Sequence, residues 1–174
     1  MDSKSVFPDP LKIRYKGYFD WPGVYKFVWK WLLDRQFRVH EKRYKDKVEN
    51  AFGNELEVDV WGEKEVTEYY KYRVDIAYHL WESKEVPVTI NGKQTKTWLG
   101  RIEIKIRGTV FTDWQKRYDR DNNKTHKFME DFLNKVVLKY EIEMRHVDPL
   151  DKDLHALEGK IKKIFKMETD PISV

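Results

Sequence analysis

Two long segments of the chain, residues 65–81 and 98–114, alternate between apolar and polar positions. In both, the even-numbered residues are mainly aliphatic or aromatic, and the odd-numbered residues are mainly polar or charged. A period of two is typical of β-strands with one buried face. The dipeptide Asn91-Gly92, a common hairpin turn, lies between them. The pattern predicts a long antiparallel hairpin, in which Gly100 and Gly108 interrupt the apolar row and allow a bend or a close approach.

The register of this hairpin poses a constraint. A continuous ladder that turns on Asn91-Gly92 places even residues opposite odd ones, so that Ile76 would lie beside Arg107. A shift of one residue is therefore required to bring both apolar rows to the same face. Pro87 is the predicted position of the shift, because proline cannot donate to a central ladder. Residues 86–90 and 93–97 would form a short distal hairpin.

Three further strands and three helices are predicted along the chain. Alternation predicts strands at 11–19, 38–48 and 55–61, and spacings of three and four predict helices at 22–36, 125–145 and 149–167. The first helix carries two apolar stripes, so it should be buried on two sides or expose Trp29 and Leu33 to a partner. The heptad-like row of the last helix favours a packed terminal helix over a dimer seam.

Together these elements predict an α+β fold. A curved antiparallel sheet of about six strands would pack against an N-terminal helix and a long C-terminal helix, with a further terminal helix after it. The expected organisation is a single domain over 11–167, with flexible tails at 1–10 and 168–174.

The order of these elements resembles the helix-grip arrangement of START and Bet v 1-like domains. That resemblance implies a cavity between the sheet and the long helix for an apolar or amphipathic ligand. The candidate lining residues are Tyr70, Tyr72, Tyr78, Trp98, Trp114 and Phe132. The same aromatic side chains could instead fill the space as a packed core. The stretches Tyr15-Lys-Gly-Tyr-Phe-Asp, Trp31-Leu-Leu-Asp-Arg and Glu41-Lys-Arg-Tyr are similar to small uncharacterised archaeal proteins.

Composition narrows the class of protein only slightly. The 174 residues include no cysteine, and 34 basic residues against 30 acidic ones give a net charge of +4. No stretch approaches the length of a membrane span, and the first ten residues lack the apolar run of a signal peptide. These features predict a soluble cytoplasmic protein, and they leave its oligomeric state open.

The odd-numbered face of the long hairpin is the second candidate surface. It carries basic residues at Lys71, Arg73, Arg101, Lys105 and Arg107. Aromatic residues at 69, 81 and 111 share its parity. Cations can neutralise phosphates while aromatic rings stack on unpaired bases, so RNA or single-stranded DNA is a possible partner. A plain solvated sheet face is the alternative.

Two further groups of residues could carry chemistry. Glu103-Ile-Lys105 with Asp75 is similar to the acidic and Glu-x-Lys pattern of restriction-type nucleases, in which carboxylates hold Mg²⁺. Cross-strand charge pairing explains the same residues. His146 to His155 gathers two histidines and three aspartates, but Asp148 before Pro149 is also typical of a helix start.

These considerations favour a non-enzymatic binding domain, with no catalytic residue, metal or cofactor assigned. Its groove between sheet and helices would take an apolar ligand or a protein partner. Nucleic-acid binding on the charged sheet face and a Mg²⁺-dependent nuclease are the alternatives.

Overall fold

The computed structural model describes residues 2–47, 53–90, 93–115, 128, 132 and 142–167. Its elements are β1 (Asp2–Ser5), β2 (Leu11–Phe19), α1 (Trp21–Asp34), β3 (Arg38–Lys47), β4 (Asn54–Glu65), β5 (Tyr70–Ile90), β6 (Lys93–Thr112), a π-helical turn (Glu143–Val147) and α4 (Asp148–Ile164). The predicted α+β class is confirmed: a six-stranded antiparallel sheet carries one N-terminal and one C-terminal helix. Most of the predicted helix 125–145 and the tail 168–174 lie outside the described residues.

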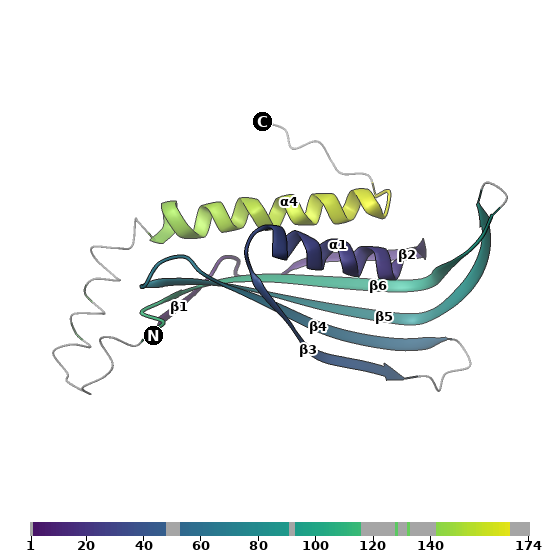
Figure 1. Cartoon of the computed structure of the whole chain (residues 1–174), viewed down its shortest axis with the longest axis horizontal. Coiled ribbons are helices and arrows are strands. Elements are labelled where there is room, and N and C mark those ends of the chain that lie inside the picture. The colour runs from purple at the N-terminus through teal and green to yellow at the C-terminus, as the bar shows by residue number, and fades with distance from the viewer. Residues whose placement is uncertain are drawn as a thin grey trace.

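The strands lie in the order β1, β6, β5, β4, β3, and β2 also pairs with β6. β1 pairs with the C-terminal part of β6 and β2 with its N-terminal part. β5 and β6 form the long central hairpin, whose distal end bends toward the side that carries the helices (Figure 1). Residues 2–5, predicted within a flexible tail, thus form an edge strand. Four residues are too few to show an alternation in the sequence.

Both helices lie on one face of the sheet, which we call the covered face (Figure 1). Its core combines the apolar rows of the strands with the inner stripes of the helices. The buried strand residues are Ile13, Phe19, Leu56, Val58, Val60, Val74, Ile76, Tyr78, Leu80, Ile102, Ile104, Ile106 and Val110. The helices contribute Trp21, Val24, Val28, Trp31, Leu32, Leu150, Leu154, Leu157 and Ile161. The heptad-like row of the last helix is therefore part of this core, as the packed-helix prediction required.

The helix ends follow their local sequence signals. Asp20 caps α1, its carboxylate accepting the Gly23 N–H at 3.0 Å, and Pro22 occupies the first turn, where its missing N–H is tolerated. At α4 the π-helical turn leads directly into Asp148, with Pro149 in the first turn. Asp148 and Asp151 lie in that turn, where carboxylates oppose the helix dipole favourably.

A β-bulge sets the register of the long hairpin. Between Trp81 and Lys84 two residues of β5 stand against Gly100 alone on β6, which produces the required one-residue shift. Glu82 adopts the left-handed region with φ of 51°. A Cβ at Gly100 would lie 2.8 Å from the Cα of Ser83, so only glycine fits against the bulge.

The prediction that this register shift occurs at Pro87 is wrong. Pro87 pairs in register with Lys96, beyond Ser83, where the pairing of β4 with β5 ends. In the described chain, β5 therefore pairs only with β6 at Pro87. Proline is tolerated at the edge of a sheet, where the position of its missing N–H faces solvent.

Gly108 has a different role on the same strand. It faces α4, and a Cβ there would lie 2.6 Å from Cδ1 of Leu154. The missing side chain lets the helix approach the sheet closely, as the sequence predicted for this position.

Candidate functional site

The space between sheet and helices is occupied by side chains. Tyr70 and Tyr78 are buried there, and the Tyr78 ring packs edge-on against Trp21 at 5.1 Å between centroids. Burial raises the pKa of the Tyr78 hydroxyl. Tyr72 is half-buried and hydrogen-bonds Nδ1 of His146 at 2.9 Å, and burial raises its pKa to about 12. Tyr70 and Tyr72 both contact the ring of His146, whereas Tyr78 lies eight residues from Tyr70 along β5 and packs against Trp21 and Tyr25.

The other three predicted cavity residues, Trp98, Trp114 and Phe132, have different surroundings. Trp98 is half-buried at the edge of the core. Trp114 follows the left-handed residue Asp113, which ends the alternation, and its indole N–H donates to the carbonyl of Thr67. Phe132 is 48% exposed. The structure thus places Tyr70 and Tyr72 beside His146 and Tyr78 beside Trp21, about 26 Å further along β5, so the six residues do not surround one hollow.

The opposite face of the sheet, which we call the open face, carries no helix in the described part of the chain (Figure 1). The odd-numbered residues of β4, of β5 as far as Trp81 and of β6, and the even-numbered residues of β2, point to it. Its charged residues before the bulge of the long hairpin are Lys12, Arg14, Lys16, Arg38, Arg43, Lys45, Lys47, Glu55, Glu57, Asp59, Glu63, Glu65, Lys71, Arg73, Asp75, Arg101, Glu103, Lys105 and Arg107. All five basic residues that the sequence assigned to this face lie on it.

Charges on the β3–β4 side of the open face are largely neutralised in pairs. Arg43 lies 2.5 Å from Glu57, and Lys47 lies 2.9 Å from Glu55. Lys71, a predicted nucleic-acid contact, forms an ion pair with Glu63. Opposite charges on neighbouring strands stabilise the sheet, so this side serves mainly as a pairing surface.

Arg73 on β5 is also engaged by its own neighbours. Its guanidinium lies 2.8 Å from a carboxylate oxygen of Asp75 and 4.8 Å over the ring of Trp61. The hydrogen bond that Arg73 donates to the Asp75 carboxylate is the main cause that raises the pKa of Arg73. On β6, Arg101 lies 2.8 Å from Glu82 and Lys105 lies 2.9 Å from Glu103, so of the five predicted cations Arg107 alone has no carboxylate within 4.0 Å among the described residues.

The β2–β6 side carries an excess of cations, and we call it the basic half. It comprises Lys12, Arg14, Lys16, Arg101, Lys105 and Arg107. Among the described residues, Lys12, Lys16 and Arg107 have no carboxylate within 4.0 Å. The three β2 residues were not predicted as part of this surface, because only the long hairpin was considered. Their alternation with the apolar row of β2, at Lys12, Arg14 and Lys16, was the available signal.

One buried carboxylate holds the centre of the basic half. Glu103 lies 2.9 Å from Lys105 and 2.5 Å from Arg14. Hydrogen bonds from Lys105 and Arg14 hold the pKa of Glu103 below its usual value, against the opposing effect of its burial. It remains ionised and fixes two of the cations in place.

Three hollows with shared lining residues form a groove along the open face. Their volumes are about 380, 270 and 550 Å³. The first two share Asp59, Ala77 and Lys105, and the last two share Glu103. One wall of this groove carries five residues of the basic half, Arg14, Lys16, Arg101, Lys105 and Arg107. The other wall carries the carboxylates of Glu57, Asp59 and Asp75.

Two tryptophans mark the ends of the groove. Trp61 is stacked on His40 at 4.6 Å and covered by Arg73, so both contacts occupy its ring. Trp81 lines the largest hollow, and its ring contacts His79 at 3.8 Å between centroids. Trp81 thus has one ring contact, with His79, whereas Trp61 has two, so Trp81 is the more available of the two rings.

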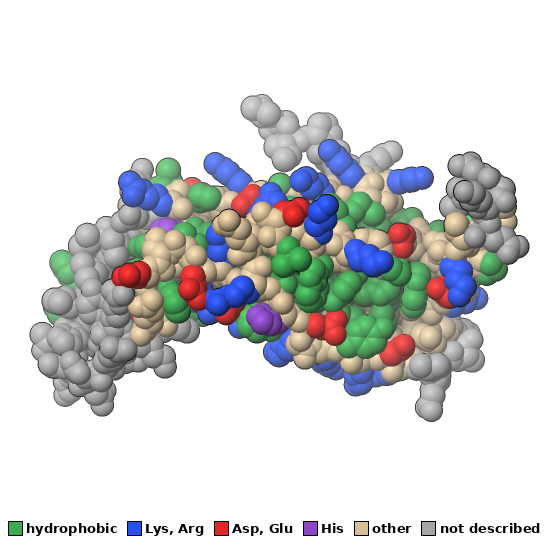
Figure 2. Space-filling view, viewed as in Figure 1, with side chains coloured by type: hydrophobic (Ala, Val, Ile, Leu, Met, Phe, Trp, Pro, Cys, Tyr) green, Lys and Arg blue, Asp and Glu red, His purple; other side chains and the backbone are tan. Residues whose placement is uncertain are grey.

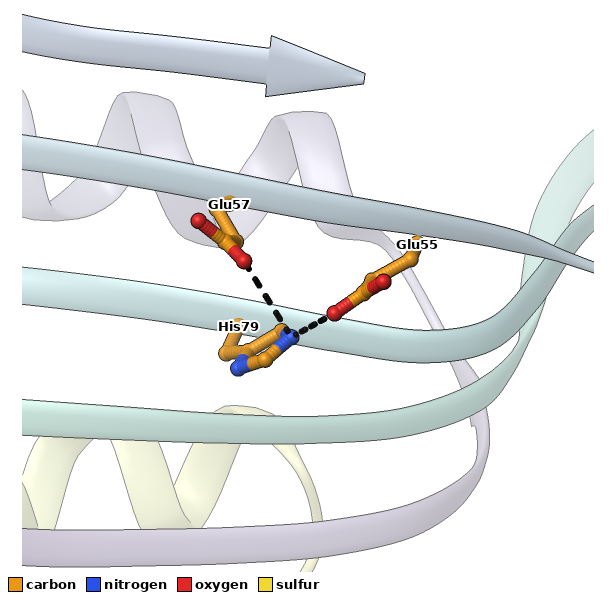
Figure 3. Close-up of side chains that lie close together, drawn as sticks. All are labelled: Glu55, Glu57 and His79. Carbon is orange, nitrogen blue, oxygen red and sulfur yellow. Dashed lines mark hydrogen bonds and ion pairs between the residues drawn. The ribbon is translucent and has the colours of Figure 1, made fainter. Parts of the chain in front are cut away.

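Glu55, Glu57 and His79 bring three potential metal ligands together (Figure 3). Nε2 of His79 lies 2.7 Å from Glu55 and 4.0 Å from Glu57. Lys47 and Arg43 already balance the two carboxylates, and hydrogen bonds from Lys47 and His79 lower the pKa of Glu55. The cluster is accounted for as a cross-strand ion-pair network.

The nuclease-like residues do not converge on one point. Asp75 stands opposite Arg107, which is four residues from Glu103 on β6. This separation is about 13 Å along the strand, too far for two carboxylates to share one Mg²⁺ ion. The two histidines of the 146–155 stretch also have different surroundings. His146 is buried beside Tyr72, whereas the exposed His155 pairs with Asp151 and Glu158 along α4.

A separate apolar surface lies on the outer side of α1. Tyr25, Trp29 and Leu33 line a shallow hollow of about 330 Å³ between Lys26 and Lys30. Hydrophobic side chains gather over this helix in Figure 2. Leu33 is 51% exposed, and Trp29 is half-buried. The second apolar stripe of α1 is therefore only partly covered.

The length of the helices and the similarity of the sequence to known proteins both bear on the class of protein. Within the described residues, no helix is both long and apolar enough to cross a membrane. No protein-family model matches the sequence, and a comparison with curated proteins found no significant relative.

Proposed function

We propose that the protein binds single-stranded nucleic acid in the groove of its open face. The observation that carries the proposal lies in the basic half: Lys16 and Arg107 have no carboxylate within 4.0 Å among the described residues, and both line hollows of the groove. Phosphate contacts supply most of the affinity in such complexes, and they require cations that are not already neutralised.

The geometry of the groove suits an unpaired strand. The cations on β2, Lys12, Arg14 and Lys16, lie two residues apart on one face, or about 7 Å. On β6, Lys105 and Arg107 have the same spacing, and Arg101 lies four residues before Lys105. Trp81 lies in the same groove, where a base could stack on its ring. A backbone track beside an aromatic platform is the arrangement that single-stranded binders use.

The original leading prediction, an apolar ligand or protein partner between sheet and helices, stays a prediction. The covered face gives it less support, since Tyr70 and Tyr78 are buried against neighbouring side chains there.

The test is binding of fluorescently labelled, mixed-sequence RNA and DNA oligonucleotides, measured by anisotropy between about 50 and 300 mM salt. Affinity should fall linearly with log salt, and Arg107→Glu or Lys16→Glu should weaken binding and reduce the slope by about 0.7 each. Lys30→Glu on α1 is the matched control, since it makes the same charge change away from the groove.

Binding that is absent at low salt, or weakened equally by Lys30→Glu, would reject the proposal. A thermal melt of each variant establishes that the fold is retained.

A further inference from the structure

We infer that Asp59 makes the groove selective for guanine, an inference that rests on the proposed nucleic-acid function. Asp59 lies on β4 and lines both the first and the middle hollow of the groove. Bases of a single strand expose their Watson–Crick edges, so an acceptor in the groove can read them directly.

Asp59 differs from the other carboxylates of the open face. Each of the others has a basic partner within 4.0 Å: a lysine, an arginine or, for Glu55, also His79. Asp59 has no ion pair or side-chain hydrogen bond in the described part of the chain. Its two oxygens are therefore available to a ligand.

The neighbours of Asp59 explain why it is left without a partner. Arg43 stands opposite Asp59 on β3 but turns to Glu57, 2.5 Å away. Lys105, across the groove, is held by Glu103 at 2.9 Å. Both nearby cations are thus fixed by other carboxylates.

The floor beside Asp59 is open enough to receive a base. Ala77 lies opposite Asp59 on β5, between it and Lys105 on β6, and its methyl group is the smallest side chain of that row. A planar base can lie over Ala77 with one edge toward Asp59 and its phosphate toward Lys105. Trp81, four residues further along β5, is about 13 Å away and can stack on another nucleotide of the same strand.

The chemistry of an ionised carboxylate favours guanine among the four bases. Guanine presents two adjacent donors on its Watson–Crick edge, N1–H and the 2-amino group, which match the two carboxylate oxygens. Paired hydrogen bonds to a charged acceptor are stronger and more directional than single neutral ones. In uracil the donor at N3 is flanked by two carbonyl oxygens, which a carboxylate repels.

The experiment compares the affinities of (UUG)₃ and (UUI)₃, in which inosine differs from guanosine only by the absent 2-amino group. The wild-type protein should bind the guanosine oligonucleotide roughly tenfold more tightly, the value of one hydrogen bond to a charged acceptor. Asp59→Asn keeps the shape of the side chain but replaces one acceptor oxygen by an NH₂ donor, which cannot accept from the second guanine donor, so the ratio of affinities should approach one.

Asp75→Asn is the matched control, because it makes the same change on the same wall at a carboxylate that Arg73 already engages. It should raise the affinity for both oligonucleotides and leave their ratio unchanged. The ratio is the measured quantity, since either neutral variant also relieves repulsion of phosphates.

Two outcomes separate this inference from the function on which it rests. Tight, salt-dependent binding with equal affinity for both oligonucleotides, or a ratio that Asp59→Asn leaves intact, would overturn the role of Asp59 and keep the function. Failure to bind either oligonucleotide at low salt would reject the function itself.

Discussion

The two faces of the sheet are built from the same strands, yet they differ in how their side chains are satisfied. On the covered face, apolar residues such as Ile104 and Leu154 are fully buried in one core that excludes water. On the open face, charges meet in pairs on one side and remain partly unpaired on the other. The difference indicates that the stability of the fold depends mainly on the covered face and the proposed binding on the open face. Substitutions on the covered face should therefore lower stability, and substitutions on the open face should change affinity.

The largest effect is expected on the covered face. Ile161→Ala in α4 removes a fully buried side chain and should lower the free energy of unfolding by about 2–5 kcal/mol, because it leaves a cavity. Ile164→Ala on the same helix is the control, since Ile164 is 41% exposed and should cost far less. Urea unfolding of both variants measures the difference, and equal losses would break the assignment of the core.

A smaller effect, and one on affinity alone, is expected at Trp81. Removing its ring by Trp81→Ala should weaken oligonucleotide binding by about 1–3 kcal/mol, the value of one base stacked on an aromatic side chain. The matched variant is Trp61→Ala, whose ring is already occupied by His40 and Arg73. If both variants lose the same affinity, the distinction between the two tryptophans is wrong.

The smallest effect concerns pH and Glu103. Because Lys105 and Arg14 lower the pKa of this carboxyl in the folded state, its contribution to stability is complete above the ordinary value of 4.5 and is lost as pH falls through the lower folded pKa. Its cationic partners are exposed, so the contribution should be under about 1 kcal/mol. Glu103→Gln should therefore be less stable than wild type near neutral pH, and the two should converge in acid. Denaturant unfolding across pH 2.5 to 7 checks this, and a difference that grows in acid would contradict it.

Much of the fold follows from local periodicity. The strand at 11–19 and the capped helix after Asp20 were predictable because alternation and capping depend on neighbours in sequence. The need for a register shift was also predictable from parity. Its position was not, because the bulge depends on Glu82 in a left-handed conformation and on Gly100 from the opposite strand.

The candidate site was predictable only in part, because it depends on which strands lie side by side. Arg101, Lys105 and Arg107 could be assigned to one face from their spacing. The addition of Lys16 from β2, and the pairing of Arg73 with Asp75, required the order of strands and the side-chain contacts. That Asp59 has no ion pair likewise depends on the contacts of Arg43 with Glu57 and of Lys105 with Glu103, which the sequence does not show.

The exposed strand β3 has a consequence for the behaviour of the protein at high concentration. Within the described chain it pairs only with β4, and its residues from His40 onward are exposed, which leaves a free row of backbone donors and acceptors. Such an edge can template the addition of another strand and so start fibrous aggregates. The lysines and arginines along β3, together with its irregular register after Glu41, oppose that growth. The charges that contribute little to the proposed site thus protect the sheet against self-association.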